Sequence, residues 1–323
     1  MNSFGRVFRI HLFGESHGAA VGVCVDGCPP GIPLVPGDFD YDLSRRQPGA
    51  RGTTPRKEDD RPELISGVFN GHTTGAPLTI VFANKNTRPK DYSSVLRQPR
   101  PGHADMVAAK RFRGYQDYRG GGHFSGRLTL PLVAAGVLAK KIVHDISISA
   151  RLKEAGGSET VEMNVEKALQ EGDSIGGIVE CVSENIPLGW GEPFFDSVES
   201  VISHLAFAIP AIKGIEFGSG FRSATMRGSE HNDPIIDKSG KTKSNNAGGI
   251  SGGLTNGNPL VFRVAVKPTS SISREQKSID RETGKVEAME VRGRHDACIA
   301  LRVPVVVEAI TAIALADFSM IYQ

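Results

Sequence analysis

Short apolar runs along the chain predict two groups of β-strands. Eight segments are rich in Val, Ile, Leu and Phe and are bounded by Gly, Pro or Asn, which is typical of strands. These strands are expected at 7–13, 20–25, 64–69, 77–83, 146–152, 177–183, 215–217 and 260–267.

Longer apolar runs with helical spacing predict the helices. They are expected at 105–113, 128–143, 163–171, 196–208 and 303–318. Asp105 begins the first helix, Pro131 fits the first turn of the second, and Asp196 followed by Glu199 resembles a capping box. No linker separates the two halves, so the pattern predicts one α+β domain over residues 1–323.

Long irregular segments separate these elements. They are expected at 27–62, 84–104, 218–258 and 268–296. Long loops in a compact domain are usually functional, and these hold most of the Arg, His and Gly clusters. The loops are therefore where a site is expected.

The composition excludes several classes of protein. Lys and Arg number 38 against 36 Asp and Glu, and a net charge of +2 argues against a nucleic-acid binder. The longest apolar stretches fall short of a membrane span, and the first residues lack the apolar core of a signal peptide. The four cysteines form no metal-binding spacing. A soluble cytoplasmic protein with reduced thiols is predicted, with no membrane or nucleic-acid partner.

One glycine-bounded loop carries adjacent serine and histidine residues. GESHG (14–18) matches the nucleophile elbow of serine hydrolases, as does GISGG (249–253). That elbow requires a helix after the turn, but AAVGVCVDG follows with strand alternation, which disfavours a hydrolase. Ser16 and His17 belong either to a ligand-binding loop or to an ordinary turn.

Two further loops have both a chemical and a plain interpretation. In RPGHAD (100–105), His103 could act as acid or base, or Asp105 could cap a helix beside an incidental histidine. RGGGHFSGR (119–127) could bind phosphate through backbone N–H groups and Arg127, or form a plain turn. There is no HExxH motif, and no metal site is predicted.

Three more loops combine glycine or proline with cations and hydroxyls: NNAGGISGG (245–253), KPTSS (267–271) and GRHDA (293–297). Five loops of this kind predict one pocket for polyanions, where guanidinium forks bind phosphate or carboxylate groups. The arginine-rich stretch 45–61 also carries three acids, so it could instead be a surface stripe.

With these residues in view, the chain resembles the chorismate synthase family over nearly its whole length. Three distant segments carry the match: GESHGAAVG (14–22), GHFSGRLTLPLVAAGVL (122–138) and RHDACIALRVPVVVEAI (294–310). Between them, in the order typical of the family, lie DGCPPGIPL, RRQPG, SGVFNGHTTGAP, RPGHAD, DYRGGG, NNAGGI and KPTSS.

The resemblance implies an enzyme that converts 5-enolpyruvylshikimate 3-phosphate to chorismate by 1,4-anti elimination of phosphate. It also implies reduced FMN as cofactor, with NAD(P)H only an indirect reductant of the flavin. A homotetramer is implied, with a β-α-β sandwich in which helices pack between antiparallel sheets. The alternative is a non-catalytic anion- or nucleotide-binding module, which would need the arginines but not His17.

The same resemblance assigns roles to individual residues. His17 is similar to the histidine that protonates the departing phosphate, His103 to the one beside the reduced flavin, and Asp296 to the group that assists proton transfer at the flavin. Substrate contacts are implied for Ser16, Arg46, Arg51, Arg100, Arg127 and Arg294. Flavin contacts are implied for Arg46, Arg51, His123, Phe124, Ser125, Pro210, Ala211, Gly252, Lys267, Pro268, Thr269, Ser270, Ser271 and Arg294.

The chain departs from the family pattern in two places. His123 and Phe124 stand where many members have Arg-Ser, which implies a flavin contact made by the backbone. Ala297 replaces the proline that commonly follows RHD.

Overall fold

The first sheet packs on one side of the molecule. The structure is a computed structural model that describes residues 1–54, 59–87, 89–291 and 295–322. Five antiparallel strands form this sheet, with Gly22 on one strand facing Phe13 on the next. Their order is β1 (Ser3–Phe4), β2 (Arg9–Gly14), β3 (Ala20–Asp26), β7 (Leu78–Ala83) and β4 (Glu63–Ser66).

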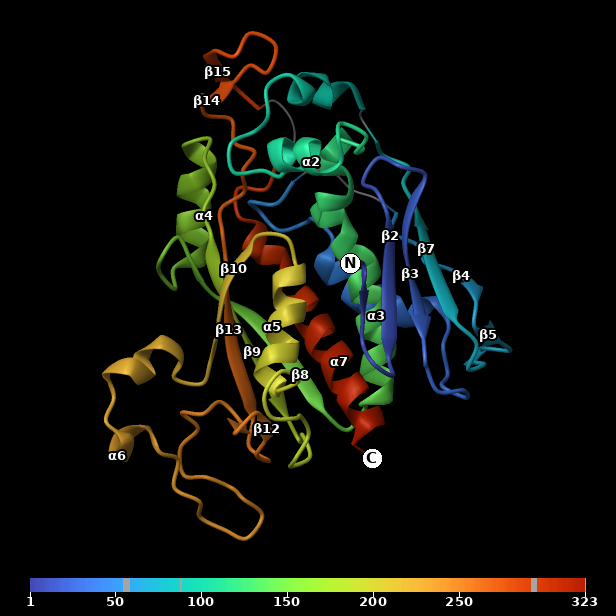
Figure 1. The fold of residues 1–323 in the computed structure, drawn as a ribbon, viewed down its shortest axis with the longest axis vertical. Coiled ribbons are helices and arrows are strands. Elements are labelled where there is room, and N and C mark those ends of the chain that lie inside the picture. Colours follow the sequence, from blue (N-terminus) through green and yellow to red (C-terminus); the bar gives the residue numbers. More distant parts are fainter. Residues whose placement is uncertain (55–58, 88, 292–294, 323) are drawn as a thin grey trace.

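A second antiparallel sheet lies on the opposite side (Figure 1). Its central strand β13 buries every second residue, as expected for a strand with one face on the core. The strand order is β10 (Ile212–Phe217), β13 (Leu260–Val266), β9 (Gly177–Glu184) and β8 (Ser147–Ala155).

Apolar helices fill the space between the sheets. Helix α3 (Thr129–Ile142) packs on the first sheet, α7 (Pro304–Ile321) packs on β8 and β9, and α5 (Val198–Ala208) packs on α7 and β10. Gly136 lets α3 and α7 approach closely, because a Cβ there would lie 2.4 Å from the Cβ of Ala309. The structure therefore confirms the α+β sandwich of helices between antiparallel sheets.

Helix α7 is the central helix of this core. It is long and apolar enough to span a membrane by length and composition, but 83% of it is buried inside the protein. Its apolar character is therefore explained by packing.

Smaller elements decorate the sandwich. The remaining helices are α1 (Asp40–Arg46), α2 (Asp105–Arg111), α4 (Val161–Gln170) and α6 (Gly228–His231). Three two-stranded hairpins pair β5 (Val68–Phe69) with β6 (His72–Thr73), β11 (Ile250–Ser251) with β12 (Leu254–Thr255), and β14 (Gln276–Ile279) with β15 (Val286–Met289). Short 3₁₀ turns occupy Pro36–Phe39, Pro89–Leu96, Arg119–Phe124, Gly126–Leu128, Gly220–Thr225 and Ile299–Arg302.

Five local expectations were wrong. The segments 27–62, 218–258 and 268–296 are not wholly irregular, because they contain α1, α6 with the β11–β12 hairpin, and the β14–β15 hairpin. The strand expected at 64–69 is broken at Gly67, whose φ of +81° is left-handed. The cap of α5 is Ser197, whose hydroxyl accepts from the backbone N–H of Ser200, and not Asp196.

Buried charges fix α1 against the central helices. The guanidinium of Arg45 donates two 2.7 Å hydrogen bonds to Glu308 of α7, and Lys140 of α3 reaches both Glu308 and Asp42. Burial alone would raise the pKa of Glu308, but Arg45 and Lys140 together hold it below its usual value. This cluster fixes the backbone that carries Arg46, the last residue of α1.

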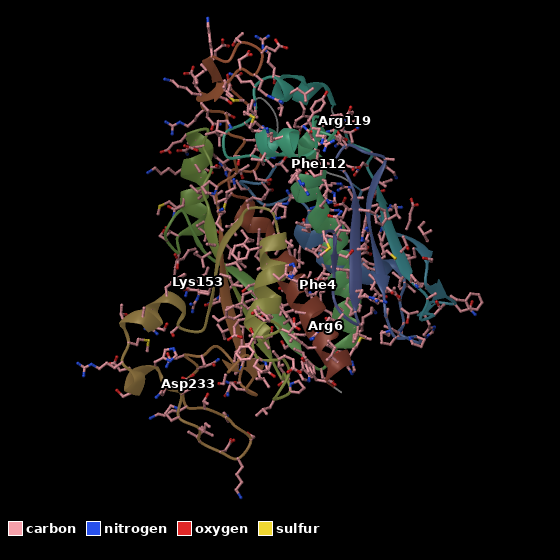
Figure 2. All side chains as sticks on the ribbon, viewed as in Figure 1. Phe4, Arg6, Phe112, Arg119, Lys153 and Asp233 are labelled. Atoms are coloured by element: carbon pink, nitrogen blue, oxygen red, sulfur yellow. The ribbon has the colours of Figure 1, made fainter. Side chains whose placement is uncertain are left out.

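The two ends of the molecule differ in character (Figure 2). At the lower end, Asp233 organises an arm of loops by accepting hydrogen bonds from the backbone N–H groups of Asn246 and Ala247. Phe112 and Arg119 mark the upper end, beside α2 and the RGGG turn. The NNAGGISGG loop (245–253), which was predicted to share the polyanion pocket, lies instead at the lower end with β11 and β12 (Figure 1).

Candidate active site

A cavity of about 600 Å³ lies where several elements meet at one end of the sandwich. The first turns of α3 and α7, the last residues of α1 and α5, and the residues directly after β13 contribute to its wall. Helix N-termini carry partial positive charge and unpaired N–H groups, so the starts of α3 and α7 favour anions here.

Two buried arginines form one wall around a shared carboxylate. Arg127 Nη1 lies 2.5 Å from Asp60 Oδ1, and Arg46 Nη2 lies 3.4 Å from Asp60 Oδ2. The Nε of Arg127 donates to the side-chain oxygen of Asn84. Arg46 Nε and Arg127 Nη2 are buried without a hydrogen-bond partner among the residues described. Buried donors of this kind are costly unless a ligand accepts from them.

The electrostatics of this wall favour an incoming anion. Burial, together with the positive charges of Arg302 and Arg127, lowers the pKa of Arg46 to about 9, and Asp60 acts in the opposite direction. Positive charge so crowded is relieved when a ligand supplies negative charge.

A second cation is held beside a histidine. The carboxylate of Asp105 accepts from Nε and Nη2 of Arg100 and from the backbone N–H of Arg100, while Nδ1 of His103 lies 2.6 Å away. Burial alone would raise the pKa of Asp105, but hydrogen bonds from Arg100 and His103 hold it well below its usual range. Asp105 therefore orients His103 and does not cap its own helix, for which Ala104 is the cap.

The KPTSS loop is joined to the segment that carries His103. Lys267 Nζ and the Ser270 hydroxyl both donate to the carbonyl of Gly102, and Arg100 Nη1 donates to the Ser271 hydroxyl. The Oγ1 atom of Thr269 is buried and has no partner within the described part of the chain. A cation and several hydroxyls thus face one region of the cavity.

His17 lies directly behind a glycine of the cavity wall. Gly120 has a φ of +60°, and a Cβ at this position would fall 2.2 Å from His17 Nδ1 and 2.8 Å from Ser16 Oγ. The His17 ring also makes an edge contact with Tyr92, with the ring centroids 5.1 Å apart. Only glycine allows this approach, which explains the RGGG sequence by packing as well as by turn geometry.

Asp296 lines the cavity from a different loop. Its carboxylate accepts from the backbone N–H of Thr54 at 2.9 Å and lies 3.4 Å from Arg302 Nη1. Arg302 also donates through Nε to the carbonyl of Arg46. One arginine thus ties the Asp296 loop to the end of α1.

His123 connects the cavity wall to the N-terminal strands. Its Nδ1 donates to the carbonyl of Gly14, and its Nε2 lies 3.1 Å from the side-chain oxygen of Asn2. The neighbouring Phe124 remains 41% exposed at the cavity and lies near Phe112.

Most of the residues singled out from the sequence come together in this structure. The cavity is lined by Arg46, Arg100, His103, His123, Phe124, Ser125, Arg127, Pro210, Ala211, Lys267, Pro268, Thr269, Ser270, Ser271 and Asp296. Ser16 and His17 are buried just behind Gly120. The interpretation of the stretch 45–61 as a mere surface stripe is therefore wrong for Arg46.

Three predicted residues are not part of this gathering. Arg51 is 78% exposed and pairs with Glu166 of α4, so the structure does not bring it to the cavity. Gly252 lies in the exposed β11–β12 turn, away from the residues that line the cavity. Arg294 lies outside the described residues.

Several cavity residues were not predicted from the sequence. Asp60, Tyr92, Phe207 and Arg302 all line the cavity. Asp60 was noted only as one of the acids that dilute an arginine-rich stretch, and its burial has no local signal. Arg302 follows the RHD motif closely in the sequence, so it could have been predicted as one of the cations of the pocket.

The geometry defines a class of protein before any comparison is made. Cations from segments far apart in sequence surround one cavity, and two histidines and a carboxylate lie in its wall or directly behind it. Within the described ranges, no group of His, Cys, Asp or Glu could hold a metal ion. The site is that of an enzyme acting on small polyanions.

Comparison with known proteins agrees with this class. The family model described as chorismate synthase matches residues 8–320. A chorismate synthase of Chitinophaga pinensis is 64% identical over 324 residues, covering 100% of this chain and 98% of that protein. One from Korarchaeum cryptofilum is 46% identical, covering 98% of this chain and 97% of that protein.

A solved structure shows the same likeness in three dimensions. A crystal structure of chorismate synthase superimposes with a TM-score of 0.74 at 26% identity, covering 98% of this chain and 92% of that one. The chain belongs to the chorismate synthase family. It is therefore a lyase of aromatic biosynthesis, and the non-catalytic binding module is not supported.

Proposed function

We propose that the chain eliminates phosphate from 5-enolpyruvylshikimate 3-phosphate to give chorismate, using reduced FMN. In this reaction the allylic C–O bond to phosphate breaks, a ring proton leaves, and a new double bond forms without net redox change. The observation that carries the proposal is the convergence of Arg46, Arg100, Arg127 and Lys267 on one cavity beside two histidines. Substrate and cofactor both carry phosphate, and such a cationic cavity suits both.

The residues present fit a flavin mononucleotide. An isoalloxazine ring needs an apolar wall, and Phe207, Ile209, Pro210 and Val303 supply one. A phosphate needs donors, which the KPTSS loop offers through Lys267 and its hydroxyls, including the unpartnered Thr269 hydroxyl. The wall also includes His123, Phe124, Ser125 and Ala211. When bound, the reduced flavin supplies an electron-rich ring that can transiently donate charge to the substrate.

The protein's own contribution is to bind anions and to move protons. Arg46, Arg100 and Arg127 are proposed to bind the anionic groups of the substrate, and Ser16, which lies behind Gly120 next to His17, is proposed to assist. His17, packed behind Gly120, is proposed to protonate the departing phosphate oxygen.

The remaining groups proposed for proton transfer line the same cavity. His103, held by Asp105, is proposed to stabilise the anionic reduced cofactor. Asp296, held by the backbone of Thr54, is proposed to help receive the ring proton. Contacts from Arg51, Gly252 and Arg294 remain predictions from the resemblance.

The wider setting is also a proposal. We propose that the chain folds as a single domain, assembles as a homotetramer and acts in the cytoplasm. NAD(P)H is proposed to act only indirectly, by reducing the flavin.

Anaerobic turnover tests this proposal. The protein is incubated with 5-enolpyruvylshikimate 3-phosphate and either dithionite-reduced FMN, oxidised FMN or no flavin. Chorismate absorbance and released phosphate are followed together. Chorismate and phosphate are expected in equal amounts, and only in the incubation with reduced FMN. Full activity without flavin would overturn the proposal.

A further inference from the structure

Asp60 is an acidic residue in the wall of a cavity that is proposed to bind anions, where a negative charge is not expected. Its side chain is 1% exposed and lines the cavity. Asp60 and Asp296 are the carboxylates found among the cavity residues that the structure describes. A buried carboxylate beside a phosphate site repels the ligand, so its presence points to another role.

Asp60 pairs with one nitrogen of each guanidinium group. Arg127 Nη1 lies 2.5 Å from its Oδ1, and Arg46 Nη2 lies 3.4 Å from its Oδ2, so each carboxylate oxygen pairs with one arginine. Asn84 occupies Nε of Arg127. The donors that remain without a partner in the described chain are Arg46 Nε and Arg127 Nη2.

Charge explains why these arginines need a permanent partner. Arg46 lies close enough to Arg302 and Arg127 for both to lower its pKa, while Asp60 raises it. Without Asp60, the two buried guanidinium groups would repel each other and lose the hydrogen bonds that fix their planes.

The backbone of Asp60 also indicates a specified position. Its φ of +45° lies in the left-handed region, which non-glycine residues other than Asn and Asp rarely adopt. Such a conformation persists where the surroundings fix it, and it directs this side chain into the cavity wall.

We infer that Asp60 is a positioning residue that pairs with Arg46 and Arg127, fixes the planes of their guanidinium groups, and so holds them in place for an anionic group of a ligand in the cavity. It acts through the arginines and does not itself touch the reacting atoms. Only the identity of that ligand, the substrate phosphate or a carboxylate, rests on the proposed function.

The sign of one change in affinity tests this inference. Removing a negative charge from an anion site strengthens anion binding if the charge merely competes with the ligand. If Asp60 positions the arginines, Asp60→Asn should instead weaken binding of inorganic phosphate to the unliganded protein by about 10-fold. Calorimetry with inorganic phosphate measures this without any turnover, so it reads out even if the proposed reaction were wrong.

Two variants separate positioning from folding. Asp59→Asn is the matched control, because Asp59 is the adjacent acid but is half exposed and pairs with the exposed Arg61. It should leave phosphate affinity unchanged. Asp60→Glu keeps the charge, so its affinity should lie nearer to wild type than that of Asp60→Asn, although its extra methylene could lower stability.

Steady-state kinetics gives the second readout. Asp60→Asn should raise KM for 5-enolpyruvylshikimate 3-phosphate by about 10-fold and change kcat by less than about threefold. A purely structural role would lower the fraction of active protein, and so kcat, at constant KM. Tighter phosphate binding by Asp60→Asn, or equal loss in the Asn and Glu variants, would overturn the inference.

Discussion

A single added methyl group can test whether the position of His17 matters. Gly120→Ala places a Cβ 2.2 Å from His17 Nδ1 and 2.3 Å from its Cε1. Favourable carbon contacts lie near 3.5–4.0 Å, so the ring must move by about 1 Å or more. The obstacle to that movement is the packed ring of Tyr92 on a neighbouring segment.

The expected effect on catalysis follows from this displacement. Misplacing a catalytic group by about 1 Å lowers rates by about 100-fold, which corresponds to about 2.7 kcal/mol in the barrier. The left-handed backbone at Gly120, with a φ of +60°, should also cost about 1–2 kcal/mol in the free energy of unfolding.

Gly114→Ala is the matched control for backbone strain. Gly114 also has a left-handed φ, of +83°, but a Cβ there would meet nothing within 4 Å. Gly120→Ala should lose more stability in urea unfolding than Gly114→Ala, because its Cβ also overpacks His17 by about 1–3 kcal/mol, and only Gly120→Ala should lose turnover with reduced FMN. If kcat of Gly120→Ala stayed within about threefold of Gly114→Ala, the assignment of proton transfer to His17 would fail.

Three other substitutions test the charged groups. Asp105→Asn should lower the free energy of unfolding at pH 7. A carboxylate with a depressed pKa contributes fully above its unfolded pKa of about 3.9 and loses that contribution as pH falls towards its folded value, so urea unfolding near pH 3 should show a smaller difference from wild type. Glu308→Gln should lower the free energy of unfolding by about 1–3 kcal/mol in urea at pH 7, because the partly exposed Arg45 and Lys140 lose charge-assisted hydrogen bonds to Glu308 but keep Asp42 as a partner. Arg127→Lys should raise KM for the substrate by about 10-fold or more while the protein stays folded by circular dichroism, since an ammonium cannot replace the fork between Asp60 and the ligand; an unchanged KM would remove Arg127 from the substrate site.

The sandwich could be predicted where apolar periodicity alone determines the element. Helices α3 and α7 are long apolar runs that pack against both sheets, and their limits were close to those expected. Helix α1 was missed because its sequence, DYDLSRR, is polar and is held by ion pairs to Glu308 and Lys140 from distant parts of the chain. The β14–β15 hairpin was missed because most of its residues are exposed and lack an apolar face.

The site was predictable as a set of loops but not as a geometry. Motifs identified the histidines and most of the arginines, but whether an arginine faces the cavity depends on its tertiary partner. Arg46 meets Asp60 in the wall, whereas Arg51, five residues later, meets Glu166 at the surface. The role of Gly120 likewise depends on a histidine about a hundred residues away, which no local pattern reports.

A structure of the ternary complex with oxidised FMN and 5-enolpyruvylshikimate 3-phosphate would test the central claim most directly. Oxidised flavin should not support turnover, so both ligands should remain intact in the crystal. The account predicts that both lie in the cavity, with the guanidinium groups of Arg46 and Arg127 hydrogen-bonded to an anionic group and His17 near the phosphate oxygen that departs. Ligands bound outside this cavity, or inside it without contact to either arginine, would contradict the account.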